Sequence, residues 1–133
     1  AEVATLAAPI ADPDDVFDPH AVKVVLDRHG HALYFSRAPI PWHRDSFGQT
    51  GRAAADAYPW LRHIGIYAYT AGFLRRYVGW PASRLEAVEA LEQLRILWQG
   101  ERIRVVTVED APHAGVDTEA DLRRVQQLLA GSA

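Results

Sequence analysis

The sequence predicts a single α/β domain, and three observations support this fold class. The chain has 133 residues, 49% of them hydrophobic, which suits one compact core and is short for two domains. Stretches of alternating apolar and polar residues, typical of strands, are interspersed with stretches of helical periodicity. Turn and capping residues separate the two kinds of stretch. We therefore expect strands and helices packed together over residues 1–133.

The first part of the chain is expected to be mostly β-structure. Gly30, in the sequence RHGH between two β-rich runs, suits a position that needs a positive φ and predicts a hairpin. Residues 38–59 hold three prolines, two glycines and no sustained period, so we expect a long excursion of the kind that serves a site or a partner surface. In order, the expected elements are a strand over 2–10 ending at Pro9, a turn or single helical turn over 12–16, and hairpin strands over 21–27 and 32–38.

The second part alternates strands and helices. Ser83 and Glu86 have the spacing of a capping box, in which each side chain bonds the other residue's backbone N–H, and Gly100 is suited to end the helix that follows. In order, the expected elements are a strand over 62–70, a short helix over 71–80 ended by Gly79 and Pro81, a helix over 84–98, a strand over 102–109 and a helix that begins at Thr118 and buries Leu122, Val125, Leu128 and Leu129.

Composition narrows the function. The net charge is −3, with 14 basic residues scattered among 17 acidic ones, which argues against a nucleic-acid-binding surface. The absence of cysteine excludes disulfides, thiolate zinc sites and cysteine nucleophiles. The absence of methionine indicates a processed product, a fragment or a partial chain. No signal peptide and no apolar run of about 20 residues is visible, so we expect a soluble cytoplasmic protein without a membrane segment.

His63, Gly65 and Tyr67 share one face of the strand over 62–70, opposite Ile64 and Ile66. Because Gly65 has no side chain, the two polar groups would stand at the ends of a shallow floor, about 6 to 7 Å away on either side. Such a layout suits a polar ligand. The alternative is that Gly65 admits a neighbouring backbone while the Tyr67 ring simply packs.

Glu92 falls inside the apolar stripe if residues 84–98 form one helix. A buried carboxylate must be paired or must bind something. Either Arg95 pairs with it, or Glu92 and the amide of Gln93 receive the hydroxyl groups of a ligand. Both alternatives remain open from the sequence.

Asp117 and Arg37 are two further candidates with structural alternatives. Asp117, directly before the expected cap Thr118, can hold loop amides and the helix dipole, or can bind a cation such as Mg²⁺ together with a second acid. Arg37 ends a strand on the face of Leu33 and Phe35, where its guanidinium suits a ligand carboxylate or a surface salt bridge. The remaining histidines show no metal-ligand spacing.

Six blocks occur in the order and spacing of CMP-Kdo synthetases, the 3-deoxy-manno-octulosonate cytidylyltransferases. The blocks are AVKVVLD, ALYFSRAPIPW, LRHIGIYAY, GFLRRYV, EALEQLRILWQGERIRV and GVDTEADL. The chain resembles the C-terminal half of this family over nearly its whole length. The resemblance implies that the chain is part of an α/β nucleotidyltransferase fold of the glycosyltransferase-A-like type. It also implies transfer of the cytidylyl group of CTP to Kdo, with release of pyrophosphate, as a step of lipopolysaccharide biosynthesis. Finally, it implies a homodimer in which the excursion after FSRAPIPW contributes to dimerisation.

The same resemblance implies residue roles. Asp117 matches the aspartate of the family's GVDT motif, which helps hold Mg²⁺ and thereby serves catalysis. Arg37, His63, Tyr67, Glu92 and Gln93 match residues that line the family's Kdo pocket.

The chain departs from the family in its N-terminal part. The family's N-terminal half, with its nucleotide loop, cytosine pocket and other metal-binding aspartate, has no counterpart here, so we expect this chain to be inactive alone. Two alternatives stay open: a cytidylyltransferase for a related sugar acid, and a non-catalytic dimerisation or binding module derived from the fold.

Overall fold

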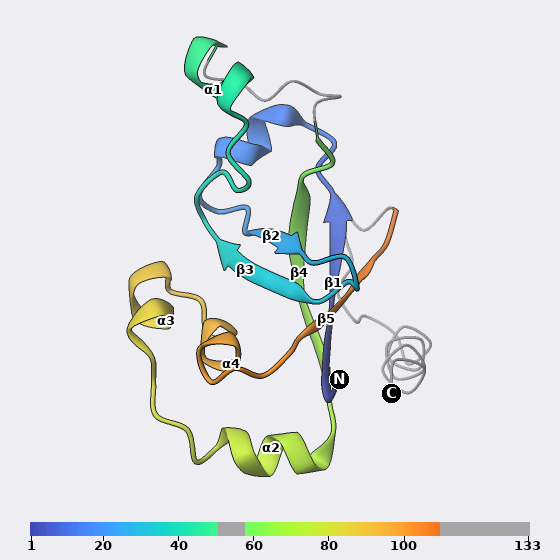
Figure 1. Ribbon diagram of the computed structural model, residues 1–133, viewed down its shortest axis with the longest axis vertical. Helices are drawn as coiled ribbons and strands as arrows, with labels where there is room; N and C mark the ends of the chain where they lie inside the picture. The colour runs from blue at the N-terminus through green and yellow to red at the C-terminus, as the bar shows by residue number, and fades with distance from the viewer. Residues whose placement is uncertain (51–57, 110–133) are drawn as a thin grey trace.

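The computed structural model describes residues 1–50 and 58–109, which build one five-stranded mixed sheet with helices around it (Figure 1). The strands run in the order β3-β2-β4-β1-β5; β1 and β5 are parallel and the other neighbours are antiparallel. The α/β class expected from the sequence is confirmed. The strands are β1 (Val3–Pro9), β2 (Lys23–Leu26), β3 (Ala32–Ser36), β4 (Leu61–Tyr69) and β5 (Arg104–Thr107).

The described helices are short, and no helix among these residues is long and apolar enough to cross a membrane. The α3 capping box is present as predicted: the Ser83 hydroxyl accepts from the Glu86 N–H, and the Glu86 carboxylate accepts from the Ser83 N–H. The helices are the 3-10 helix η1 (Pro13–Phe17), α1 (Arg44–Thr50), α2 (Ala71–Tyr77), α3 (Arg84–Glu89) and α4 (Leu94–Trp98).

The β2–β3 hairpin forms around Gly30, which has a φ of +85°, so this prediction is confirmed. The Asp27 carboxylate holds the turn by accepting from the backbone N–H groups of His29 and His31. Beyond the turn, the Gly30 carbonyl accepts from the Val105 N–H at 2.9 Å. The hairpin tip is therefore fastened to β5, at the far edge of the sheet from β3.

The strand alternation divides the apolar residues between two sheet faces. The larger cluster includes Phe35 from β3, Phe73 from α2 and Leu94 from α4, so helices and hairpin enclose one face. Ile64 and Ala68 of β4 belong to a second cluster with Leu6, Ala8 and Val106 on the opposite face. This division confirms the predicted faces of the β4 segment, because Tyr67 packs against the first cluster.

The single helix expected over 84–98 is wrong: the structure divides it into α3 and α4. Ala90 adopts the left-handed conformation, with φ 57° and ψ 47°, and ends α3. After this turn Leu91 is buried while Glu92 is exposed, so Glu92 does not lie in an apolar stripe. The break bends the chain so that Leu91, Leu94 and Ile96 all reach the large core cluster.

The excursion over 38–59 contains a helix that the sequence pattern did not predict. Phe47 of α1 is buried and stacks on Trp60, with ring centroids 5.4 Å apart. Trp60 also donates from its indole Nε1 to the Pro41 carbonyl at 2.9 Å. These contacts join both described ends of the excursion into a separate aromatic cluster. The helix expected from Thr118 lies outside the described residues.

Candidate functional site

An open pocket of about 240 Å³ lies between the end of β4, α2 and the turn that separates α3 from α4. The family resemblance predicts that Arg37, His63, Tyr67, Glu92 and Gln93 line a Kdo pocket. Three of these residues line the observed pocket: Tyr67, Glu92 and Gln93. Aromatic rings form one wall and the α3–α4 turn forms the other. The lining residues are Tyr67, Tyr69, Tyr77, Ala90, Leu91, Glu92, Gln93 and Ile96.

The tyrosine wall is built by strand alternation. Tyr67 and Tyr69 are two residues apart on β4, so their side chains share a face, and their rings stack with centroids 5.7 Å apart. Tyr69 in turn stacks on Phe73 of α2 at 5.4 Å. Burial raises the pKa of the Tyr67 hydroxyl and, to a smaller extent, that of Tyr69, and nearby Tyr77 and Glu92 add to both shifts. Both hydroxyls therefore stay protonated at neutral pH and can donate to ligand oxygens.

Glu92 and Gln93 supply the polar side of the opposite wall. Among residues 1–50 and 58–109, the Glu92 carboxylate makes no hydrogen bond or ion pair. Gln93 occupies the N-cap position of α4, but its side chain makes no capping hydrogen bond to the backbone N–H groups of the helix. A carboxylate acceptor and an amide that both donates and accepts are thus free to receive hydroxyl groups.

Arg95 does not pair with Glu92, so the structural alternative considered for Glu92 is wrong. Its Nε and Nη2 donate to the two carboxylate oxygens of Glu86, each at 2.8 Å. Arg95 lowers the pKa of this carboxyl group, since its bonds favour the charged form. The pair links α3 to α4 across the left-handed turn at Ala90. Arg95 also lies over the Tyr77 ring at 5.1 Å, which ties the turn to the tyrosine wall.

His63 lies behind the pocket, beside Tyr67, and does not line it. Its Nε2 is 2.9 Å from the Thr5 hydroxyl oxygen, and that hydroxyl donates to the Ile66 carbonyl at 2.7 Å. We therefore assign Nε2 as the donor to the Thr5 oxygen, which sets the tautomer of the neutral ring. Burial lowers the pKa of His63 to about 4, so the ring is neutral at pH 7.

Thr5 and His63 together stabilise an irregularity in β4. The β1–β4 register shifts between Thr5 and Leu6, so two residues of β4, Gly65 and Ile66, have no partner on β1. The Thr5 hydroxyl lies within hydrogen-bonding distance of the Ile64 and Ile66 carbonyls.

Within residues 1–50 and 58–109, a Cβ atom at Gly65 would meet no atom within 4 Å, so no described backbone requires a glycine there. The Tyr67 ring packs against the core, as the alternative expected. The predicted floor between His63 and Tyr67 is wrong, because neither His63 nor Gly65 lines the pocket.

Arg37 is placed at the C-terminal end of α3, where its guanidinium binds backbone carbonyls. Nε donates to Glu89 at 2.7 Å, Nη1 to Pro19 at 3.0 Å and Nη2 to Ala90 at 3.2 Å. Neither alternative predicted for Arg37, a ligand carboxylate or a surface salt bridge, describes these bonds. Arg37 does not line the pocket, but it holds Ala90, which does.

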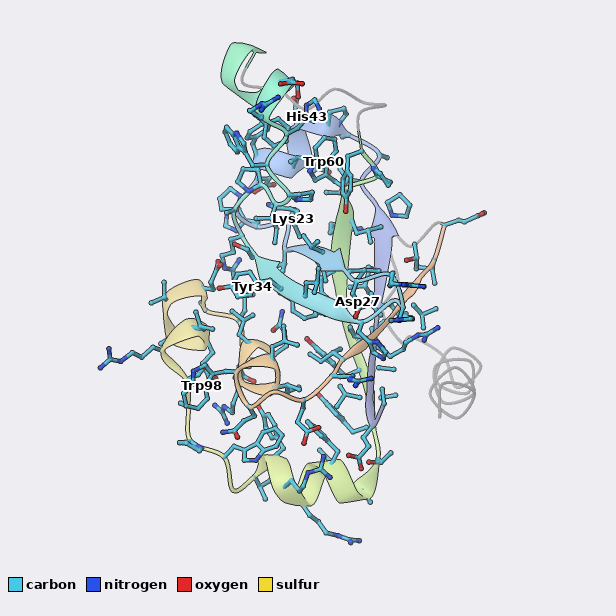
Figure 2. The ribbon with its side chains drawn as sticks, in the orientation of Figure 1. Lys23, Asp27, Tyr34, His43, Trp60 and Trp98 are labelled. Carbon is cyan, nitrogen blue, oxygen red and sulfur yellow. The ribbon has the colours of Figure 1, made fainter. Side chains whose placement is uncertain are left out.

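Lys23, the only lysine of the chain, is a buried polar residue that sequence reasoning did not single out. Figure 2 shows it inside the molecule, between Trp60 above and Tyr34 below. Its Nζ donates to the Asp18 carbonyl at 2.8 Å, and burial lowers its pKa. Tyr77 was also missed; its spacing of four residues from Phe73 on one helix was the available signal.

Asp117 lies outside the described residues. Within residues 1–50 and 58–109, no group of three or more His, Asp or Glu side chains is arranged to hold a metal ion. Mg²⁺ commonly takes only one or two protein carboxylates, so the magnesium role of Asp117 stays a prediction.

Comparison with known proteins identifies relatives of the whole chain. The family model described as cytidylyltransferase matches residues 1–103. A 3-deoxy-manno-octulosonate cytidylyltransferase from Aeromonas hydrophila is 58% identical over 130 residues, which are 98% of this chain and 51% of that protein. Its counterpart from Yersinia pseudotuberculosis is 56% identical over 97% of this chain and 51% of that protein.

A solved structure agrees with these sequence relatives. It is a CMP:2-keto-3-deoxy-manno-octonic acid synthetase complexed with CTP, which is 40% identical and superposes with a TM-score of 0.71. The superposition covers 99% of this chain and 50% of that one. The chain thus spans about half the length of the relatives it matches.

Proposed function

This chain belongs to the cytidylyltransferase family, and from that premise we propose that it is the sugar-acid-binding part of a 3-deoxy-manno-octulosonate cytidylyltransferase. The complete protein would transfer the cytidylyl group of CTP to Kdo, giving CMP-Kdo and pyrophosphate for lipopolysaccharide biosynthesis. The observation that carries the proposal is the 58% identity, over 98% of this chain, to a relative of that name.

The pocket chemistry supports a polyhydroxylated ligand. The Glu92 carboxylate and Gln93 amide can bind neighbouring hydroxyl groups, while the protonated Tyr67 hydroxyl can donate to a sugar oxygen. Leu91, Ile96 and the tyrosine rings offer apolar area to the carbon side of a sugar ring. His63 does not contact the ligand in this proposal; it acts as a positioning residue for Tyr67, whose ring centroid is 5.4 Å from its own.

In the proposed reaction the anomeric hydroxyl oxygen of Kdo bonds to the α-phosphorus of CTP. The bond from that phosphorus to the oxygen bridging to the β-phosphate breaks, pyrophosphate leaves and the hydroxyl proton is released. The part of the protein described by the structure would orient the sugar acid, because it places Glu92 and Gln93 on the turn between α3 and α4 opposite Tyr67 on β4. Mg²⁺ would supply charge neutralisation when bound.

Magnesium, dimerisation and a cytoplasmic location belong to this proposal through the family resemblance. Asp117 would be one ligand of the metal, and replacing it with Asn in the complete enzyme should lower turnover by orders of magnitude without unfolding the protein. For the homodimer, the exposed rings of Trp42 and Tyr58 beside α1 offer apolar surface on the excursion assigned to dimerisation.

The test is Kdo binding to the 133-residue chain, followed by NMR. Kdo should shift the resonances of Tyr67, Glu92 and Gln93, and a Glu92→Gln variant should bind at least tenfold more weakly; N-acetylneuraminate at the same concentration is the comparison ligand. Stronger shifts with another sugar acid would favour a related cytidylyltransferase. No shift with any sugar acid would contradict a sugar-acid pocket and favour the binding-module alternative. In a parallel assay with CTP, Mg²⁺ and Kdo, pyrophosphate release by this chain alone would contradict the expectation that it is inactive alone.

A further inference from the structure

One buried hydroxyl group lies at the irregularity between β1 and β4. Thr5 is 1% exposed and is the only polar residue of β1, whose other residues are all apolar. β1 lies between β4 and β5, so both of its edges are paired with other strands (Figure 1). Because Thr5 is shielded from solvent, its hydroxyl must find hydrogen-bond partners inside the sheet.

The partners of this hydroxyl all come from the irregular part of β4. The Thr5 hydroxyl donates to the Ile66 carbonyl at 2.7 Å, and it also lies 3.2 Å from the Ile64 carbonyl. Its oxygen accepts from Nε2 of His63 at 2.9 Å. Ile64 and Ile66 flank Gly65, which has no partner on β1. A single side chain of β1 thus joins both ends of the irregularity.

The irregularity determines which tyrosine stands at each position along β1. Thr5 is opposite Tyr67, and Val3 is opposite Tyr69. If the register of the first part of β4 continued without a shift, Tyr67 would be opposite Val3, where Tyr69 now lies. Two residues along a strand span about 6 to 7 Å. Both tyrosines would keep their face of the sheet, because the shift is by two residues, but each would move along the pocket.

The opposite wall of the pocket is fixed independently of this register. Glu92 and Gln93 lie on the turn between α3 and α4. Leu91 and Leu94, on either side of them, are buried in the larger core cluster. The separation between the two walls therefore depends on where β4 places Tyr67. A ligand that bonds both walls at once is sensitive to a displacement of even about 1 Å.

We propose that Thr5 is a positioning residue of the pocket: its hydroxyl holds β4 in the register that sets Tyr67 opposite Glu92 and Gln93. Thr5 does not line the pocket and does not touch the ligand. The effect on a ligand rests on the proposed sugar-acid function, whereas the effect on the register rests on the contacts between β1 and β4 alone.

Variants of the 133-residue chain separate this role from general stability. Thr5→Val keeps the branched shape but cannot donate to the Ile66 carbonyl, and it should weaken Kdo binding at least tenfold. Thr5→Ser keeps the hydroxyl and should restore an affinity close to that of wild type. Val16→Ala, in the separate aromatic cluster, is the stability control: it should lower the melting temperature and leave Kdo binding unchanged.

NMR measures the register without any ligand. The Thr70 N–H donates to the Glu2 carbonyl at 3.0 Å, which makes these two residues a hydrogen-bonded pair. Pair types alternate along the strands, so Thr5 and Tyr67 form a non-hydrogen-bonded pair with Cα atoms about 4.5 Å apart. A nuclear Overhauser effect between their Hα protons should be strong in wild type and Thr5→Ser, and should be lost in Thr5→Val. If the valine variant does not fold, Thr5→Cys, whose S–H is a weak donor, should show a smaller loss of the same kind.

The two measurements together decide the proposal. A Thr5→Val variant that keeps the Hα contact with Tyr67 would overturn it, whatever its affinity for Kdo. A variant that loses the contact but binds Kdo as tightly as wild type would also overturn it, because the register would then not set the pocket. If wild type binds no sugar acid, the proposed function fails, and the Hα contact alone decides whether Thr5 sets the position of Tyr67.

Discussion

The neutral, buried His63 makes a quantitative prediction about acid stability. Its pKa in the folded protein is about 4, against an ordinary value of 6.5. Between these two values the unfolded chain binds a proton that the folded chain does not, so the free energy of unfolding must fall as the pH decreases. The contribution is complete above pH 6.5 and is lost as the pH falls toward 4. At about 1.4 kcal/mol per pH unit, the loss is at most about 3.5 kcal/mol, a large part of the stability of a small domain.

The assay is urea unfolding at several pH values between 7.5 and 4.5, compared with a His63→Gln variant. Glutamine keeps a neutral N–H donor for the Thr5 hydroxyl but does not titrate, so the difference between the two pH profiles isolates His63. Exchanging the exposed His20 for Gln serves as the matched control and should leave the wild-type profile unchanged. Parallel profiles for wild type and His63→Gln would refute the reasoning, as would a wild-type protein that gains stability on acidification.

Three further substitutions test separate parts of the account. Glu92→Gln should leave the urea midpoint within about 0.5 kcal/mol of wild type, because the carboxylate is exposed and unpaired in the described structure; a large loss would mean that Glu92 is structural. Ser83→Ala should cost about 1 kcal/mol of unfolding free energy, because it removes the α3 cap, whereas an unchanged midpoint would show that the Glu86–Arg95 pair suffices. Gly30→Ala should lower the free energy of unfolding by about 1 to 2 kcal/mol, since φ is +85° at the hairpin turn. An unchanged melting temperature in a thermal scan would contradict this prediction and would show that the turn relaxes freely.

The local elements were predictable where a residue type has one clear physical role. Gly30 predicted the hairpin because its turn needs a positive φ, and Ser83 with Glu86 predicted the start of α3 because each side chain satisfies an N–H of the first turn. The alternation around Ile64 predicted the two faces of β4. In each case the signal lies within a few residues of the feature.

Features that depend on distant contacts were not predictable. Nothing in the type of Ala90 indicates a left-handed residue, and the apolar period continues through it, so the sequence favoured one helix where the structure has two. The single-helix prediction placed Glu92 in the apolar stripe, with pairing to Arg95 and ligand binding as the two alternatives. The turn at Ala90 instead brings Glu92 to the pocket, and Arg95 pairs with Glu86. The sequence pattern did not predict α1, because this helix is held in place by Phe47 stacking on Trp60, and Trp60 lies beyond the expected loop.

The pocket itself was predictable only in part. Tyr67, Glu92 and Gln93 were named from the family resemblance and lie together. His63 and Arg37 were named with them, but the structure places His63 against Thr5 and Arg37 on the carbonyls that end α3. His63 and Arg37 both hold lining residues of the pocket in position. This positioning role depends on the three-dimensional contacts between β1, β4 and α3.

The most direct measurement of the central claim is sugar-acid-dependent pyrophosphate release by this chain joined to the unmatched half of the Aeromonas hydrophila relative. CTP, Mg²⁺ and either Kdo or N-acetylneuraminate are supplied, with the full-length relative as the positive control. We expect release with Kdo, at least tenfold less with N-acetylneuraminate, and a tenfold or greater rise in KM for Kdo in Glu92→Gln. A folded joined protein that releases no pyrophosphate with Kdo, while the relative does, would contradict the assignment of this chain as the sugar-acid-binding part.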